Sequence, residues 1–145
     1  MRKADSAALL ARCRRWIVGS VLFALAMTAT AVAEETARIG PATLLKRLDA
    51  NDSALIVLDV RTPEEFAAGH VPHAVNIPYT YLPASISTLP DAANKDIVVY
   101  CETGVRAERA AARFRENGFT RLLHLDGDMR RWREAGRPLE GTTAP

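Results

Sequence analysis

Cys101 is the side chain in this sequence best suited to nucleophilic chemistry. It comes directly after the apolar run DIVVY, which is typical of a buried strand. The five residues that follow it, all candidates for binding a substrate, are Glu102, Thr103, Gly104, Val105 and Arg106. A thiol between a strand and a helix can be held as the reactive thiolate, because loop N–H groups converge on it and the helix N-terminus is partly positive. Gly104 allows a tight turn, and Arg106 offers a permanent cation for an anion.

A different interpretation of Cys101 is a small buried apolar residue at a strand end, which is a common role for cysteine. The other cysteine, Cys13, lies in a segment typical of an export signal. There a basic stretch ends at Arg15, an uncharged run covers residues 16–33, and the run closes on the small-x-small pattern Ala31-Val32-Ala33. We expect cleavage after Ala33, which would leave Cys101 as the only cysteine and favour a free reactive thiol.

The expected organisation is therefore a signal peptide at residues 1–33 and one domain at residues 34–145, located in the periplasm. An uncleaved segment would instead anchor the domain in the inner membrane, facing the periplasm. From residue 34 onward the chain has 14 basic and 16 acidic residues, although the whole sequence carries a net charge of +2. This near-neutral balance gives no basic footprint for nucleic acid, so no nucleic-acid partner is expected.

The elements that position Cys101 alternate between apolar runs and amphipathic stretches. Strands are predicted at 54–60, 74–77, 96–100 and 120–125, and helices from 41, from 63, from the end of a 102–106 turn to 117, and over 128–135. The helix from 63 is expected to begin with a cap, because Thr62 is followed by a first-turn proline and, three residues on, by Glu65. Strands buried on both faces and separated by helices predict an α/β fold with a parallel sheet. The carboxyl ends of such strands meet at one edge, where ligands bind, and Cys101 is at such an end.

Asp59 and Arg61 follow another buried strand and should lie near the same edge of the sheet. They could shape the substrate pocket, or they could form an internal ion pair that fastens the loops. The three histidines, His70, His73 and His124, lack metal-ligand spacing with other donors, so structural or solvent-exposed roles are favoured. Neither a metal nor a cofactor is expected.

Several motifs occur together in the order and spacing of a known family. They are the stretch from Leu58 to Pro78, the loop from Cys101 to Arg106, Asn117-Gly118-Phe119, and Leu125-Asp126-Gly127 followed by Trp132. Over nearly all of residues 38–138 the sequence resembles the single-domain rhodaneses. The resemblance implies a central parallel sheet of about five strands flanked by helices. It also implies transfer of sulfane sulfur, commonly from thiosulfate to cyanide or a thiol, through a persulfide on Cys101.

By the same resemblance, the amides of residues 102–106 would surround the persulfide. The sequence departs from the family pattern at three positions: Asp128 and His73 stand where glycine is frequent, and Ala107 stands where serine is frequent. Related phosphatases and arsenate reductases have a loop one residue longer than Cys101–Arg106, to enclose a tetrahedral oxyanion. The shorter loop favours a single sulfur atom over phosphate. A sulfur carrier or partner-binding module that does not turn over is a further alternative.

Overall fold

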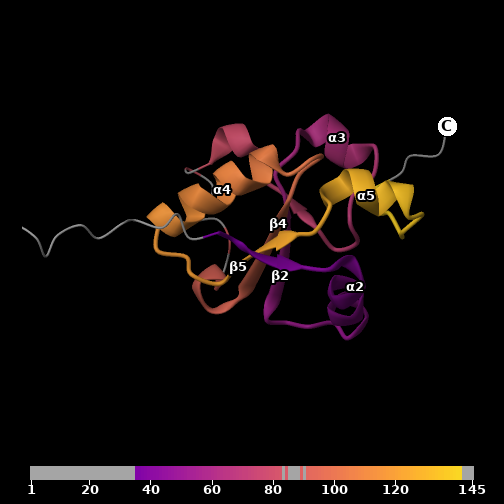
Figure 1. Cartoon of the computed structure of the whole chain (residues 1–145). Helices are drawn as coiled ribbons and strands as arrows, with labels where there is room; N and C mark the ends of the chain where they lie inside the picture. Colours follow the sequence, from indigo (N-terminus) through magenta and orange to yellow (C-terminus); the bar gives the residue numbers. More distant parts are fainter. Residues whose placement is uncertain (1–34, 83, 85–88, 90, 142–145) are drawn as a thin grey trace, which may run out of the picture. The chain divides into compact units, whose positions relative to one another are not determined.

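A parallel sheet of five strands forms the centre of the described part of the chain, in the order β1-β5-β4-β2-β3 (Figure 1). The structure is a computed structural model that describes residues 35–82, 84, 89 and 91–141, so the expected signal peptide lies outside the described residues. The strands are β1 (Ala37–Ile39), β2 (Leu55–Asp59), β3 (Val75–Asn76), β4 (Asp96–Tyr100) and β5 (Leu122–Leu125). The helices are α2 (Pro41–Asp49), α3 (Pro63–Ala67), α4 (Val105–Glu116) and α5 (Asp128–Glu134), with short 3-10 turns η1 (Tyr79–Tyr81) and η3 (Ala92–Asn94).

The two faces of the sheet are covered by different helices, because successive residues of a strand point to opposite sides. Leu58 and Val99 belong to a core with α4, whose buried residues are Ala107, Ala110, Ala111 and Phe114. Val57 and Val98 belong to a second core, which includes Leu44 and Leu48 of α2 and Met129 and Trp132 of α5. Figure 1 shows α4 and α2 on opposite sides of the strands. Burial on both faces explains why β2 and β4 are almost continuously apolar.

The predicted α/β fold with a parallel sheet is confirmed, with two differences of detail. β1 was not predicted as a strand, because only Ile39 of its three residues is buried and no apolar run marks it. The tight turn expected over 102–106 is shorter, because α4 already begins at Val105, so Val105 and Arg106 belong to its first turn. Within the residues that the structure describes, no helix is long and apolar enough to cross a membrane.

The short helix α3 begins with a reciprocal cap that fixes its place beside the Cys101 loop. The Thr62 side chain accepts a hydrogen bond from the Glu65 N–H at 3.3 Å, and the Glu65 carboxylate accepts one from the Thr62 N–H at 3.0 Å. Pro63 occupies the first turn, where its missing N–H has no cost. This arrangement, predicted from the sequence, holds the Glu65 carboxylate at the helix N-terminus.

Candidate active site

Cys101 follows β4 directly and lies at the carboxyl edge of the sheet, under the first turn of α4. Its side chain is buried, with 1% of the residue exposed, and its sulfur accepts a hydrogen bond from the Gly104 N–H at 3.1 Å. Gly104 has a φ of +100°, and a Cβ there would lie 3.0 Å from Asp128 Oδ2. Only glycine therefore satisfies both the backbone turn and the space beneath the loop. An N–H aimed at the sulfur from the start of a helix stabilises an anionic form.

The first turn of α5 forms the floor of the loop through three hydrogen bonds. Asp128 Oδ1 accepts the Cys101 N–H at 2.8 Å, the Met129 N–H donates to the Cys101 carbonyl at 3.1 Å, and the Arg130 N–H donates to the Glu102 carbonyl at 3.1 Å. Asp128 and His73 have φ angles of +53° and +60°, which lie in the left-handed region that favours glycine. The sequence pattern marked both as departures from glycine, but it gave no role to the Asp128 carboxylate, which fastens the backbone of Cys101.

Arg106 is held by a carboxylate from another element. Its two terminal nitrogens donate to the two oxygens of Glu65 at 2.6 and 2.8 Å, a bidentate pair that joins α4 to α3. These hydrogen bonds lower the pKa of Glu65 to about 2. They also raise the pKa of Arg106, with a smaller contribution from the sulfur of Cys101, so the guanidinium stays charged beside the thiol. Sequence reasoning gave Glu65 only a capping role, because its second partner is 41 residues away.

Asp59 and Arg61 form the internal ion pair that was one of the two expected roles. Arg61 Nη2 donates to Asp59 Oδ2 at 2.6 Å and to the Gly69 carbonyl at 2.8 Å, and the two side chains are 2% and 0% exposed. Burial would lower the pKa of Arg61, but the hydrogen bonds to Asp59 outweigh it and raise that pKa. The pair reaches the Cys101 loop through Arg61 Nη1, which lies 3.7 Å from Glu102 Oε2. Its main role is therefore to fix the loop after β2, beneath the site.

The remaining loop residues face outward to different degrees. The Glu102 carboxylate pairs with Arg61 and with Arg133 of α5. Thr103 is exposed, and Val105 is 58% exposed, an unusual position for a valine. Cys101 and Gly104 are therefore the buried part of the loop, and Thr103 and Val105 are its solvent-exposed part.

His70 and His73 take structural or exposed positions, as the sequence indicated for the histidines. His73 is exposed, and His70 stacks on the Phe66 ring at 3.6 Å. His124 is buried on β5 between two carboxylates, those of Glu108 and Asp128. Over the part of the chain that the structure describes, no group of His, Cys, Asp and Glu is arranged to hold a metal ion. The described residues around Cys101 supply one thiol, the Gly104 N–H and paired charges, which suits a covalent intermediate on sulfur.

The comparisons with known proteins agree with this arrangement. The family model described as Rhodanese-like domain matches residues 40–135, which run from α2 through the Cys101 loop to α5. A protein named sulfurtransferase from Allochromatium vinosum is 35% identical over 96 residues, or 66% of this chain and 87% of that protein. A tRNA uridine(34) hydroxylase from Salmonella heidelberg is 36% identical over 107 residues, and the match covers 66% of this chain and 31% of that enzyme. The crystal structure of a rhodanese-related protein from Thermoplasma volcanium is similar with a TM-score of 0.63 at 28% identity, covering 72% of this chain and 98% of that one.

Proposed function

Because the chain belongs to the rhodanese-like domain family, we propose that it is a sulfurtransferase that carries sulfane sulfur as a persulfide on Cys101. The donor is thiosulfate or a similar compound, and the acceptor is cyanide or a thiol. The observation that carries the proposal is the environment of Cys101. The residue is 1% exposed, and its sulfur accepts a hydrogen bond from the Gly104 N–H at 3.1 Å. Because a relative named tRNA uridine(34) hydroxylase contains a similar segment, membership of the family does not identify the sulfur donor, and the donor has to be tested directly.

The reaction consists of two displacements on sulfur. The Cys101 thiolate attacks the outer sulfur of thiosulfate, a new S–S bond forms, and sulfite leaves with the electron pair of the bond that breaks. The persulfide places its outer sulfur about 2 Å beyond the cysteine sulfur. There the loop amides hold it as an anion. Cyanide or a thiolate then attacks the outer sulfur, and the electron pair of the S–S bond returns to Cys101. This is covalent catalysis of the ping-pong type.

The two arginines of the site are already paired, which restricts how an anionic donor can bind. Arg106 is bound by both oxygens of Glu65, and Arg61 is bound by Asp59. A donor anion therefore shares Arg106 with Glu65 instead of meeting a free guanidinium. The uncompensated attraction comes from the loop N–H groups and the N-terminus of α4, a 12-residue helix. Such a site favours a donor whose reacting sulfur, more than its oxyanion, enters the loop.

Intact mass spectrometry tests this function. After treatment with thiosulfate, the wild-type domain should gain the mass of one sulfur atom, and it should lose that atom on addition of cyanide while thiocyanate appears. Cys101→Ser, which keeps the size of the side chain, should do neither. The proposal fails if the wild-type protein gains no sulfur, or if Cys101→Ser gains it equally.

Two other results would establish the alternatives. Hydrolysis of an aryl phosphate without persulfide formation would establish a phosphatase, against the short Cys101–Arg106 loop. A persulfide that forms but is passed on no faster than the uncatalysed background would establish a sulfur carrier.

We also propose that the domain works outside the inner membrane after removal of residues 1–33. The support is the sequence pattern of a basic stretch, an apolar run and a small-x-small site. Mass analysis of the protein recovered from the periplasm should give an N-terminus at Glu34. A full-length chain in the membrane fraction would establish the anchored form, and a full-length chain in the cytoplasm would reject export.

A further inference from the structure

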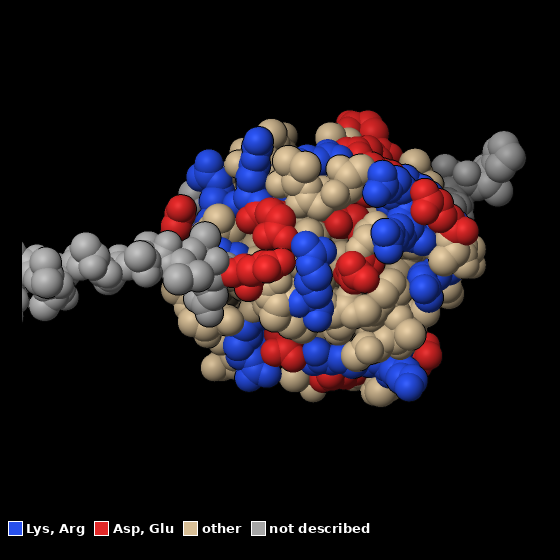
Figure 2. Space-filling model, viewed as in Figure 1, with Lys and Arg blue, Asp and Glu red and all other residues tan. Residues whose placement is uncertain are grey.

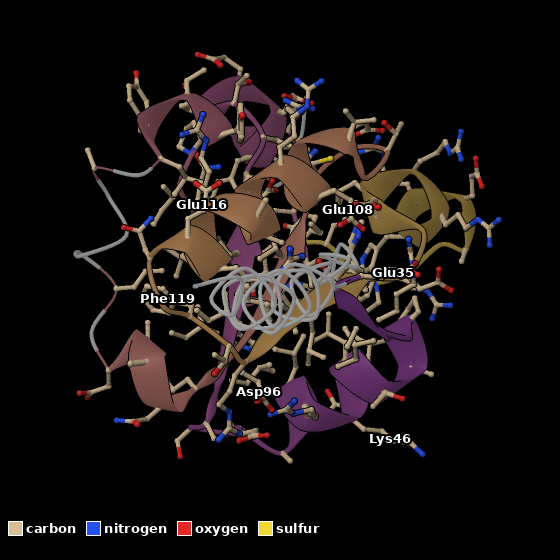
Figure 3. All side chains as sticks on the ribbon, turned by 60° about the vertical axis from the view of Figure 1, so that its left-hand side comes forward. Glu35, Lys46, Asp96, Glu108, Glu116 and Phe119 are labelled. Carbon is tan, nitrogen blue, oxygen red and sulfur yellow. The ribbon has the colours of Figure 1, made fainter. Side chains whose placement is uncertain are left out.

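His124 of β5 is enclosed by two carboxylates from two different helices. Its Nδ1 lies 2.6 Å from Glu108 Oε1 of α4, and its Nε2 lies 2.9 Å from Asp128 Oδ2 of α5. The His124 side chain is 3% exposed and that of Asp128 is 5% exposed. Figure 3 shows Glu108 at the end of α4 that lies towards α5, with Glu116 at the other end. The three side chains thus form a row that ends beneath Cys101, because the second Asp128 oxygen accepts the Cys101 N–H.

The hydrogen-bond geometry determines how many protons this row carries. A neutral imidazole has one N–H and one lone pair, and its lone pair would face a carboxylate oxygen at hydrogen-bond distance. Both carboxylates also accept from other donors: Asp128 from the Cys101 N–H, and Glu108 from the Thr36 hydroxyl at 3.3 Å. If the two carboxylate oxygens that face the ring both act as acceptors, the ring must donate from both nitrogens, which makes it an imidazolium.

The charge of Asp128 matters because of its closeness to the sulfur. The sulfur and the Asp128 carboxylate both lie next to Gly104. The Gly104 N–H donates to the sulfur at 3.1 Å, and a Cβ added to Gly104 would lie 3.0 Å from Asp128 Oδ2. A bare carboxylate here would hold the Cys101 backbone but oppose a thiolate or an anionic persulfide. The imidazolium on the other side of that carboxylate offsets its charge.

We propose that His124 is a positioning residue of the sulfur-transfer site, whose imidazolium lets Asp128 fasten the Cys101 amide without opposing the anionic sulfur. The inference rests on the proposed function for its biological meaning, but it concerns the reactivity of the thiol itself. It assigns the row Glu108–His124–Asp128 to the support of the Cys101 loop.

The surrounding charges are consistent with a retained proton. Burial would lower the pKa of His124, but the hydrogen bonds to Asp128 and Glu108 outweigh it and raise that pKa above its ordinary value. From β1, Arg38 lies 3.7 Å from Glu108 and 3.9 Å from Asp126. A cleft of about 390 Å³ is lined by all three members of the row together with Arg38, Arg130 and Arg131. Figure 2 shows acidic and basic side chains interspersed over the face of the domain that carries β5 and α4.

The rate at which iodoacetamide alkylates Cys101 tests the proposal, because it reports the thiolate without any sulfur donor. His124→Gln keeps a donor towards Asp128 but removes the positive charge. One uncompensated charge at this range, partly screened by the open cleft, should slow alkylation at pH 7 about tenfold. Adding Asp128→Asn removes the opposing carboxylate, so the double variant should return to within about threefold of the wild-type rate. His73→Gln, the same change at an exposed histidine remote from the row, is the matched control.

A merely structural role of His124 gives the opposite result in the double variant. Adding Asp128→Asn would then slow the alkylation of Cys101 further, and that outcome overturns the proposal. If His124→Gln does not fold, nitrogen chemical shifts of the wild-type imidazole decide: both ring nitrogens protonated at pH 7 support the proposal, and a neutral ring rejects it. Sulfur transfer is measured separately. An inactive sulfurtransferase with the rescue intact would refute only the proposed function, and an active one without rescue would refute only this inference.

Discussion

Gly104 is the glycine of the Cys101 loop, and adding one methyl group there should be costly. In Gly104→Ala the backbone keeps a φ of +100°, which costs a residue with a side chain about 1–2 kcal/mol. The new Cβ would lie 3.0 Å from Asp128 Oδ2 and 3.2 Å from His124 Cε1, so Asp128 has to move. Movement strains its 2.8 Å hydrogen bond to the Cys101 N–H, which contributes about 1–1.5 kcal/mol more. We expect the free energy of unfolding to fall by about 2–4 kcal/mol.

Gly118, at the end of α4, is a matched control. It has a φ of +85°, but no atom lies within 4 Å of its Cβ position. Gly118→Ala should therefore cost only the backbone term, about 1–2 kcal/mol, and should leave the alkylation rate of Cys101 unchanged. Urea unfolding followed by circular dichroism measures the first quantity, and iodoacetamide the second. Equal losses of stability in the two variants, with equal alkylation rates, would refute the close contact between Gly104 and Asp128 as the cause.

Three further predictions concern the charged groups. Glu65→Gln should lower the free energy of unfolding by about 1–2 kcal/mol at pH 7 after allowance for solvent screening. The difference should vanish as the pH falls from 4.5, the unfolded pKa, through about 2, the folded one; urea unfolding at several pH values checks this. Asp59→Asn leaves the buried Arg61 with only the more distant Glu102 carboxylate, at 3.7 Å, as a counterion and should cost about 3–5 kcal/mol in the same assay, whereas replacing both residues with apolar ones should cost less. His124 has a raised pKa, so its contribution is complete below about 6.5 and is lost as the pH rises through the folded value; His124→Gln should lack this alkaline decline in unfolding free energy.

The parts of the site that could be predicted from the sequence are those built from neighbouring residues. The strand, the cysteine and the glycine turn stand next to one another in the chain, so β4 and the position of Cys101 followed from local pattern. The cap of α3 is equally local, since Thr62 and Glu65 are three residues apart. In these cases the pattern in the sequence and the contact in space coincide.

The parts that could not be predicted depend on contacts between distant elements. Arg106 meets Glu65 across 41 residues, and the Cys101 N–H meets Asp128 across 27. Nothing in the local pattern states which carboxylate will reach which donor. For Asp59 and Arg61 the sequence left a pocket role and an ion pair open. The structure shows the ion pair. The Arg61 side chain is only 2% exposed, and a buried guanidinium needs a counterion nearby.

The central place of β4 in the sheet has a consequence for local opening of the molecule. β4 is paired on both sides, with β5 and β2, whereas the edge strands β1 and β3 have three and two residues. Amide hydrogens of the edges should exchange with solvent through small fraying events, while those of β4 should exchange only through much larger cooperative openings. Cys101 directly follows β4, so fraying of either edge strand should leave intact the hydrogen bonds of the strand that positions it.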